Sequence, residues 1–177
     1  HATPTFTQRV FHEFFPPPRF LEMPAVGLDI SDSAVTALEL VRRRDAFVIG
    51  RFGRRPLQRG AVTGGYVHDK ERVIAALRNL REELRFSFVN ASLPEEKAYL
   101  YATKIPPLPQ KEMRGAILFT LEENVPLSPG EALFDYTVIR NTSPPGDSTE
   151  VSVTVLPRTV ASTYAGLFQA AGLVPLS

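Results

Sequence analysis

The chain has 177 residues, of which 44% are hydrophobic and 22% are charged, and its 20 basic and 19 acidic residues leave a formal net charge of +1. This composition is typical of a globular protein with room for one or two compact units. The near-zero charge argues against a general attraction to nucleic acid, and the absence of cysteine excludes disulfides and thiolate chemistry. The sequence has no stretch of about 18 consecutive apolar residues that could span a membrane.

Residues 1–24 are predicted to form a separate N-terminal arm. Val10, Phe11, Phe14 and Phe15 lie at helical spacing, and the three prolines that follow them stop the helix. A short helix with so aromatic a face needs a cover, which is either this protein's own core or a partner or membrane surface.

The next part of the chain, residues 25–94, has the pattern of one α/β layer. Three strands joined by tight turns are expected first, at residues 25–31, 34–41 and 45–53. A glycine-rich connection follows and leads to Asp69, which is a suitable N-cap for a helix. That helix has one buried stripe with spacings of four, three and four residues, made of Val73, Leu77, Leu80 and Leu84. A strand over residues 86–93 closes the layer, and Pro94 ends it.

The turn between the first two strands is the candidate ligand site. The first strand carries an acid, Asp29, and the turn continues with the small polar residues Ser31, Asp32 and Ser33. This turn resembles the phosphate-binding turn of actin-like ATPases, in which backbone amides face the phosphates and the acid orients Mg²⁺ through water. On that resemblance Asp29, Ser31 and Ser33 are the candidate cofactor-binding residues. However, serine replaces the expected glycine at 31, and the Asp32 carboxylate is unfavourable beside a phosphate. A polar turn between two core strands explains the same residues.

Residues 95–173 follow a different pattern, strand, helix, strand, strand and a final helix. The strand is expected at residues 96–105, the first helix at 110–124, the hairpin at 132–140 and 150–157, and the last helix at 159–171. Gly172 is placed to close that last helix. This order predicts a compact two-layer unit.

Several segments together carry a resemblance to a known family. They are residues 26–40, the glycine-rich connection 60–69, residues 92–97, the strand end 104–106, and residues 122–128 with 134–136. In order and spacing they resemble the N-terminal half of the PilM family, the actin-like proteins of type IV pilus and type II secretion machines, which are related to the division protein FtsA.

The resemblance implies an α/β (α+β) fold. Residues 25–94 correspond to part of the actin-like, ribonuclease-H-like subdomain 1A, and residues 95–173 to the inserted strand–helix–strand–strand subdomain called SHS2. Residues 174–177 begin the return to the first subdomain. The second half of the family fold, with the other phosphate loop and the adenosine site, has no counterpart here. Nucleotide and Mg²⁺ are therefore expected only in a full-length form.

The resemblance also implies a function, that of a non-enzymatic scaffold in the cytoplasm, peripheral at the inner membrane. The expected partner is the N-terminal tail of a PilN-like membrane protein, in a groove between the two subdomains. The candidate partner-binding residues are Ser92, Leu93, Pro94, Thr103, Lys104, Ile105 and Met113. The alternatives are an FtsA-like division protein that acts by polymerisation and partner recruitment, and an actin-like ATPase in full-length form. The three histidines are far apart in sequence, and neither a catalytic nor a metal site is predicted.

Two further expectations concern the surface. Seven arginines fall between residues 42 and 59, at positions 42, 43, 44, 51, 54, 55 and 59. They form either a solvated hairpin edge or a contact with anionic lipid headgroups. The strand at 86–93 is expected to have an open edge, covered by residues 10–15, by the tail 173–176, or by a second copy of the chain, with self-association as the result.

Overall fold

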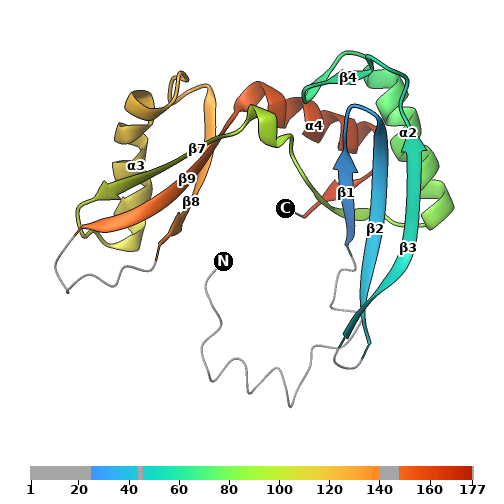
Figure 1. The fold of residues 1–177 in the computed structure, drawn as a ribbon, viewed down its shortest axis with the longest axis horizontal. Coiled ribbons are helices and arrows are strands. Elements are labelled where there is room, and N and C mark those ends of the chain that lie inside the picture. Colours follow the sequence, from blue (N-terminus) through green and yellow to red (C-terminus); the bar gives the residue numbers. More distant parts are fainter. Residues whose placement is uncertain (1–24, 44–45, 140–147, 177) are drawn as a thin grey trace.

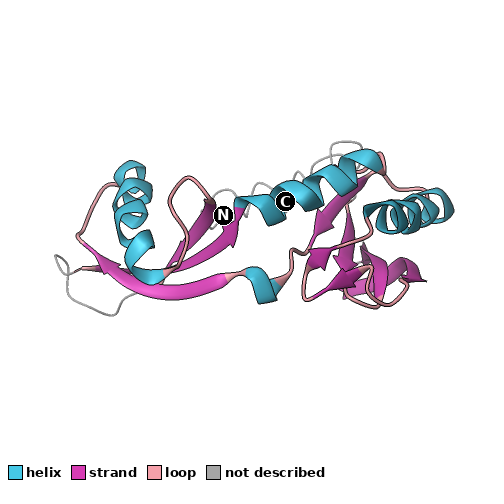
Figure 2. Ribbon diagram, turned by 90° about the horizontal axis from the view of Figure 1, so that it is seen from above, coloured by secondary structure: helices cyan, strands magenta, loops and turns pink. Residues whose placement is uncertain are grey.

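The computed structural model describes residues 25–43, 46–139 and 148–176, which form two units bridged by a helix (Figure 1). Seen from above, the molecule is elongated, with one unit at each end (Figure 2). The elements of the first unit are β1 Val26–Ile30, β2 Ala34–Arg43, β3 Ala46–Pro56, β4 Val62–Thr63, β5 Tyr66–Val67, α2 Lys70–Leu84 and β6 Phe88–Ala91. After them come the short 3₁₀ turn η1 Glu95–Lys97, β7 Tyr99–Ile105, α3 Gln110–Asn124, β8 Ala132–Val138, β9 Thr149–Pro157, α4 Arg158–Ala170 and β10 Val174–Pro175.

The first unit is built on a mixed sheet of five strands in the order β10-β6-β1-β2-β3. Strands β1, β2 and β3 are antiparallel neighbours, whereas β6 runs parallel to β1. The predicted order of three antiparallel strands, a helix and a further strand is confirmed. Asp69 caps α2 as expected, because its Oδ1 accepts a hydrogen bond from the Arg72 amide at 3.1 Å.

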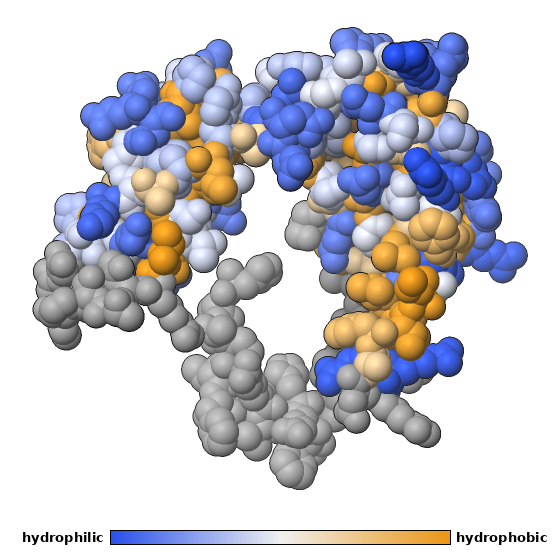
Figure 3. All heavy atoms as spheres, viewed as in Figure 1, coloured by the Kyte–Doolittle hydropathy of each residue, from blue (hydrophilic) through white to orange (hydrophobic). Residues whose placement is uncertain are grey.

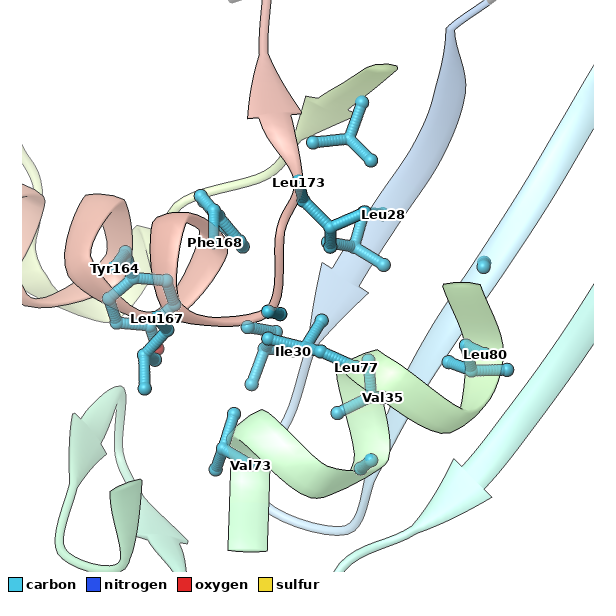
Figure 4. Packing of buried hydrophobic residues seen from close by; sticks show 14 of the residues in the cluster. Leu28, Ile30, Val35, Val73, Leu77, Leu80, Tyr164, Leu167, Phe168 and Leu173 are labelled. Carbon is cyan, nitrogen blue, oxygen red and sulfur yellow. The ribbon is translucent and has the colours of Figure 1, made fainter. Parts of the chain in front are cut away.

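The core of this unit lies between the sheet and two helices, α2 and α4. The inward side chains of β1 alternate with outward ones, so Val26, Leu28 and Ile30 are buried. They meet Val73, Leu77 and Leu80 of α2, and Tyr164, Leu167 and Phe168 of α4 (Figure 4). The last helix was predicted to lie within the second unit, at residues 95–173. By packing it belongs to the first, and the boundary lies near Leu156.

The second unit is a three-stranded antiparallel sheet in the order β7-β9-β8, with α3 on one face. Its separate core contains Ile105, Met113, Ile117 and Leu121 together with the inward valines of β9. The predicted α+β fold with a strand–helix–strand–strand unit is thus confirmed.

Three expectations about the chain are corrected or left aside. The strand expected at 96–105 begins at Tyr99, because residues after Pro94 form a 3₁₀ turn in which the Ala98 amide donates to the Glu95 carbonyl at 2.9 Å. The edge of β6 is not open, since β10 pairs with it in parallel, so the tail is the candidate that covers it. The arm at residues 1–24 lies outside the described residues.

Within the described part of the chain, no helix is long and apolar enough to cross a membrane.

Candidate functional site

A hollow of about 460 Å³ lies where the parallel strands β1 and β6 end. Open α/β sheets place ligands outside the carboxyl ends of their strands, which makes this position a natural site. The turn after β1 and the connection after β6 supply its walls. The lining residues are Asp29, Ile30, Ser31, Asp32, Ser33, Ser92, Leu93, Pro94, Glu95 and Glu96. We call it the strand-end hollow.

The polar side chains of the turn are largely bonded within the protein. The Ser31 amide donates to the Ala34 carbonyl at 2.9 Å, and the Ser31 hydroxyl accepts from the Ala34 amide at 3.2 Å. Asp32 Oδ2 accepts from the Gly64 amide at 3.0 Å, and Asp29 Oδ1 accepts from the Ser92 hydroxyl at 2.7 Å. The two carboxylates therefore fasten the turn to its neighbours.

The strand-end hollow is acidic. Four of its ten lining residues are Asp29, Asp32, Glu95 and Glu96, and none of the ten is lysine or arginine. The pKa of the nearby buried Tyr164 phenol is raised to about 12. Burial is the largest cause, and the negative charges of Glu96, Asp32 and Asp29 add to it. A phosphate bound here would meet four carboxylates and no cation among the lining residues, so these residues fit a neutral or cationic group better than a nucleotide. Arg59 lines an adjoining hollow that shares Asp32 and Ser33. No cluster of three potential metal ligands occurs among the described residues.

A second site lies along the exposed side of α4, between the two units. Two hollows, of about 280 Å³ and about 500 Å³, share Thr159 and Thr163 as lining residues. The first is also lined by Gly65, Tyr66, Val67, Lys70, Val160 and Tyr164, and the second by Leu127, Gly130, Glu131, Pro157, Arg158 and Ser162. Because they adjoin along one helix, we treat them as one inter-unit trough.

Hydrogen bonds and close packing fix the first-unit wall of this trough. The Tyr164 hydroxyl donates to the Gly65 carbonyl at 3.2 Å. Gly65 has a φ of +75°, and a Cβ there would lie 2.5 Å from the Pro94 Cβ, so only glycine fits. Lys97 Nζ lies 3.7 Å from the centre of the Tyr66 ring.

The opposite wall is fastened by one arginine at the start of α4. Arg158 Nε donates to the Gly130 carbonyl at 3.0 Å, and its Nη2 donates to the Ala132 carbonyl at 3.2 Å. Its amide also donates to the Glu131 carbonyl at 2.7 Å. Both walls are therefore set by the fold, and the trough is a preformed groove.

The predicted partner-binding residues fall in two places. Ser92, Leu93 and Pro94 line the strand-end hollow, and buried Pro94 also packs behind Gly65 of the trough. The others lie in the second unit, toward the far end of β7 and in α3: Thr103 and Lys104 are at least partly accessible, whereas Ile105 and Met113 are core residues. At about 3.3 Å per residue, the length of β7 separates the two groups by roughly 20 Å.

The trough residues were not among the sequence predictions. Thr159 and Thr163 lie one helical turn apart on the face of α4 that is not buried, which is where any solvated helix carries such residues. One related feature is that β9 passes directly into α4 without a loop, which does not reveal the groove beside the helix.

The fold is of the partial actin-like α+β class, with a strand–helix–strand–strand insertion, and the inter-unit trough lies between the two units. The sequence matches the family described as type IV pilus assembly protein PilM over residues 27–176, and the chain belongs to that family.

Two solved structures share the fold. The first, a PilM–PilN type IV pilus biogenesis complex, has a TM-score of 0.77 and 23% identity, covering 87% of this chain and 46% of that one. The second is the cytoplasmic domain of EpsL, an inner-membrane component of the type II secretion system of Vibrio cholerae. Its TM-score is 0.57 at 12% identity, covering 85% of this chain and 54% of that one. The chain thus spans about half the length of each structure. A search of curated protein sequences found no match.

Proposed function

We propose that this chain is the partner-binding part of a type IV pilus assembly scaffold on the cytoplasmic side of the inner membrane. Membership of the PilM family supports this role, and the first structural relative is a complex of PilM with PilN. The partner we propose is the N-terminal tail of a PilN-like membrane protein. The EpsL relative supports a use of the same fold in type II secretion machines.

The tail binds in the inter-unit trough. The observation that carries this proposal is that two hollows share Thr159 and Thr163 and take their walls from both units. An extended peptide needs an elongated groove, and this one runs along α4 with its walls already fixed. Its lining includes the apolar residues Tyr66, Val67 and Leu127 and the charged residues Lys70, Glu131 and Arg158.

Binding of a labelled tail peptide, followed by fluorescence anisotropy, tests the proposal. Thr163→Arg places a long side chain in the middle of the trough and is expected to weaken binding at least tenfold. Leu93→Ser, in the strand-end hollow, is the matched control and is expected to leave binding unchanged. If Leu93→Ser abolishes binding and Thr163→Arg does not, the strand-end hollow is the groove; if the unaltered chain does not bind the peptide, the partner is wrong.

We also propose that this chain has no enzymatic activity and holds no nucleotide by itself. The argument is the set of residues that lines the strand-end hollow, which includes four carboxylates and neither lysine nor arginine. Titration calorimetry with Mg-ATP is expected to give no binding heat. Micromolar affinity for the chain of 177 residues would contradict this proposal.

A further inference from the structure

The hairpin of β2 and β3 extends beyond the rest of its sheet. Strand β1 pairs with β2 only as far as Leu38, whereas β2 and β3 stay paired through Arg43 and Ala46. The register shifts between Leu38 and Leu40, where Arg51 bridges Glu39 to the end of α2. We call the part past this shift, residues 40–43 and 46–49, the distal hairpin; Figure 1 shows it below the sheet.

The distal hairpin and the adjoining part of β3 expose large apolar side chains. Leu40 is 58% exposed, Phe47 69%, Ile49 67% and Phe52 58%. Cross-strand partners point to the same face, and the register pairs Leu40 with Ile49 and Leu38 with Phe52. These residues therefore form one apolar surface, visible in Figure 3 as an orange patch over the lower part of the hairpin.

Arginines border this apolar surface. Arg42 lies opposite Phe47, and Arg54 lies two residues beyond Phe52, so both start from the apolar face. Arg43 follows Arg42 at the end of the hairpin and starts from the other face. Among the described residues none of these three is in an ion pair, whereas Arg51 and Arg55 are paired with Glu39 and Glu83. The hairpin thus combines exposed aromatic and aliphatic groups with cationic groups that are available for an external anion.

We propose that the distal hairpin docks on an anionic lipid surface. The apolar side chains enter the boundary between headgroups and acyl chains, and Arg42, Arg43 and Arg54 bind lipid phosphates. The charge selects this occupant. A second copy would bring the same arginines to the interface, and the N-terminal arm carries as many basic as acidic side chains, Arg9 and Arg19 against Glu13 and Glu22. A lipid surface supplies both an apolar layer and negative charge.

This surface is separate from the tail-binding trough. The trough is lined by α4, β5 and the loop before β8, whereas the docking surface belongs to β2 and β3. The protein would then touch the membrane directly as well as through a membrane-anchored partner. The two contacts can be tested independently because no residue is shared.

Co-sedimentation of the full chain with vesicles tests the proposal. Binding is expected to phosphatidylcholine vesicles that contain phosphatidylglycerol, and not to phosphatidylcholine alone. Raising the salt from about 0.1 M to about 1 M shortens the screening length from about 10 Å to about 3 Å and is expected to weaken binding strongly. The double variant Arg42→Gln/Arg43→Gln is expected to bind about 25-fold more weakly, at about fivefold for each basic residue.

The contribution of the apolar side chains to vesicle binding is tested with the double variant Phe47→Ser/Ile49→Ser, which is expected not to bind. Matched controls lie in the second unit: Leu100→Ser/Phe119→Ser, which are 72% and 85% exposed in the native protein, and Lys104→Gln/Lys111→Gln. Both controls should bind as the unaltered chain does. Circular dichroism confirms that each variant is folded.

Four results would overturn the proposal. The first is absence of binding by the unaltered chain, and the second is equal binding by hairpin and control variants. The third is a loss of vesicle binding in the double variant Phe11→Ser/Phe14→Ser while the hairpin variants still bind, which would assign the contact to the N-terminal arm. The fourth is a dimer that depends on the hairpin while vesicles bind nothing, which would assign the surface to a second copy.

Discussion

The two larger sheets are covered by helices on one face and turn the other face outward, but the two outward faces differ in chemistry. On the three-stranded sheet the register places Lys104 opposite Glu150, Ala102 opposite Ser152, and Asp135 opposite Thr154. On the five-stranded sheet the corresponding outward pairs include Leu38 with Phe52 and Leu40 with Ile49. Leu100 is the main apolar exception on the smaller sheet.

The difference shows which sheet needs no further cover than its own helices and which sheet has an outward face that is poorly suited to water. A strand that alternates apolar inward and polar outward is stable against water on one side, and the three-stranded sheet follows that rule. A sheet with apolar residues on both faces is one that another surface covers. The outward face of the five-stranded sheet is therefore where a lipid surface or further protein is expected to dock, separately from the tail in the inter-unit trough.

The largest expected effect separates the buried faces from the outward ones. Leu77→Ala in α2 and Ile117→Ala in α3 each remove a side chain with 0% exposure and are expected to cost about 2–5 kcal/mol of unfolding free energy. Phe119→Ala, at 85% exposure on α3, is the control and should cost less than about 0.5 kcal/mol. Urea unfolding measures all three, and equal midpoints for Ile117→Ala and Phe119→Ala would contradict the assignment of the second core.

A smaller effect is expected where the first unit meets the connection to the second. Gly65→Ala introduces a Cβ 2.5 Å from the Pro94 Cβ at a φ of +75°, so both clash and backbone strain oppose it. We expect a loss of about 2–4 kcal/mol. Gly60→Ala is the matched control, since its φ is +85° but no atom lies within 4 Å, and it should lose only about 1–2 kcal/mol. Thermal unfolding of the pair measures the difference, and equal losses would mean that Pro94 can move.

A third prediction concerns acid. Hydrogen bonds from Arg51 lower the pKa of Glu39 below its ordinary value, and a bond from Ser128 does the same to Glu131 in the second unit. A lowered folded-state pKa gives stability that is present above the unfolded value of 4.5 and is lost as the pH falls through the folded value. Glu39→Gln is expected to lower the unfolding free energy by about 1 kcal/mol near neutral pH. The unfolding free energy of this variant is also expected to depend less steeply on pH in the acid range. Urea midpoints followed from about pH 6 down to about pH 3 test it; an unchanged slope would show that the Glu39 bond does not persist in solution.

The smallest effect on stability compares the outward faces themselves. Phe52→Ser and Leu100→Ser replace residues that are 58% and 72% exposed, and each should change the unfolding free energy by less than about 0.5 kcal/mol. Their effect on an apolar fluorescent dye should differ, because only Phe52 belongs to a continuous apolar surface. We expect dye fluorescence to fall for Phe52→Ser and to stay constant for Leu100→Ser. Equal responses would mean that the two outward faces are alike.

Local patterns predicted most of the elements. The helix α3 has the predicted bounds, Gln110 to Asn124, because Pro109 sets its start and the apolar spacing runs to its last turn. The strand at 86–93 was overestimated at both ends: Phe86 is buried as expected, yet β6 has only four residues, Phe88–Ala91. Burial and strand pairing are separate properties, and an apolar run reports only the first.

The sequence could not predict which helix packs on which sheet, or which surface residues the fold brings together. The amphipathic pattern of α4 predicted a buried face but not that the face lies on the first sheet, since periodicity contains no information about the partner layer. The trough was missed for the same reason: Thr159 and Tyr66 are ordinary surface residues until the fold brings them together.

The two crossings between the units have a mechanical consequence. One crossing is the connection from β6 to β7, and the other is the direct passage of β9 into α4 at Pro157 and Arg158. Because α4 is anchored in the first core through Tyr164 and Leu167, we expect the second crossing to be stiffer than a loop connection. A pull on the three-stranded sheet is therefore delivered to the interior of the five-stranded one. We therefore expect a displacement of the three-stranded sheet to move the five-stranded sheet with it.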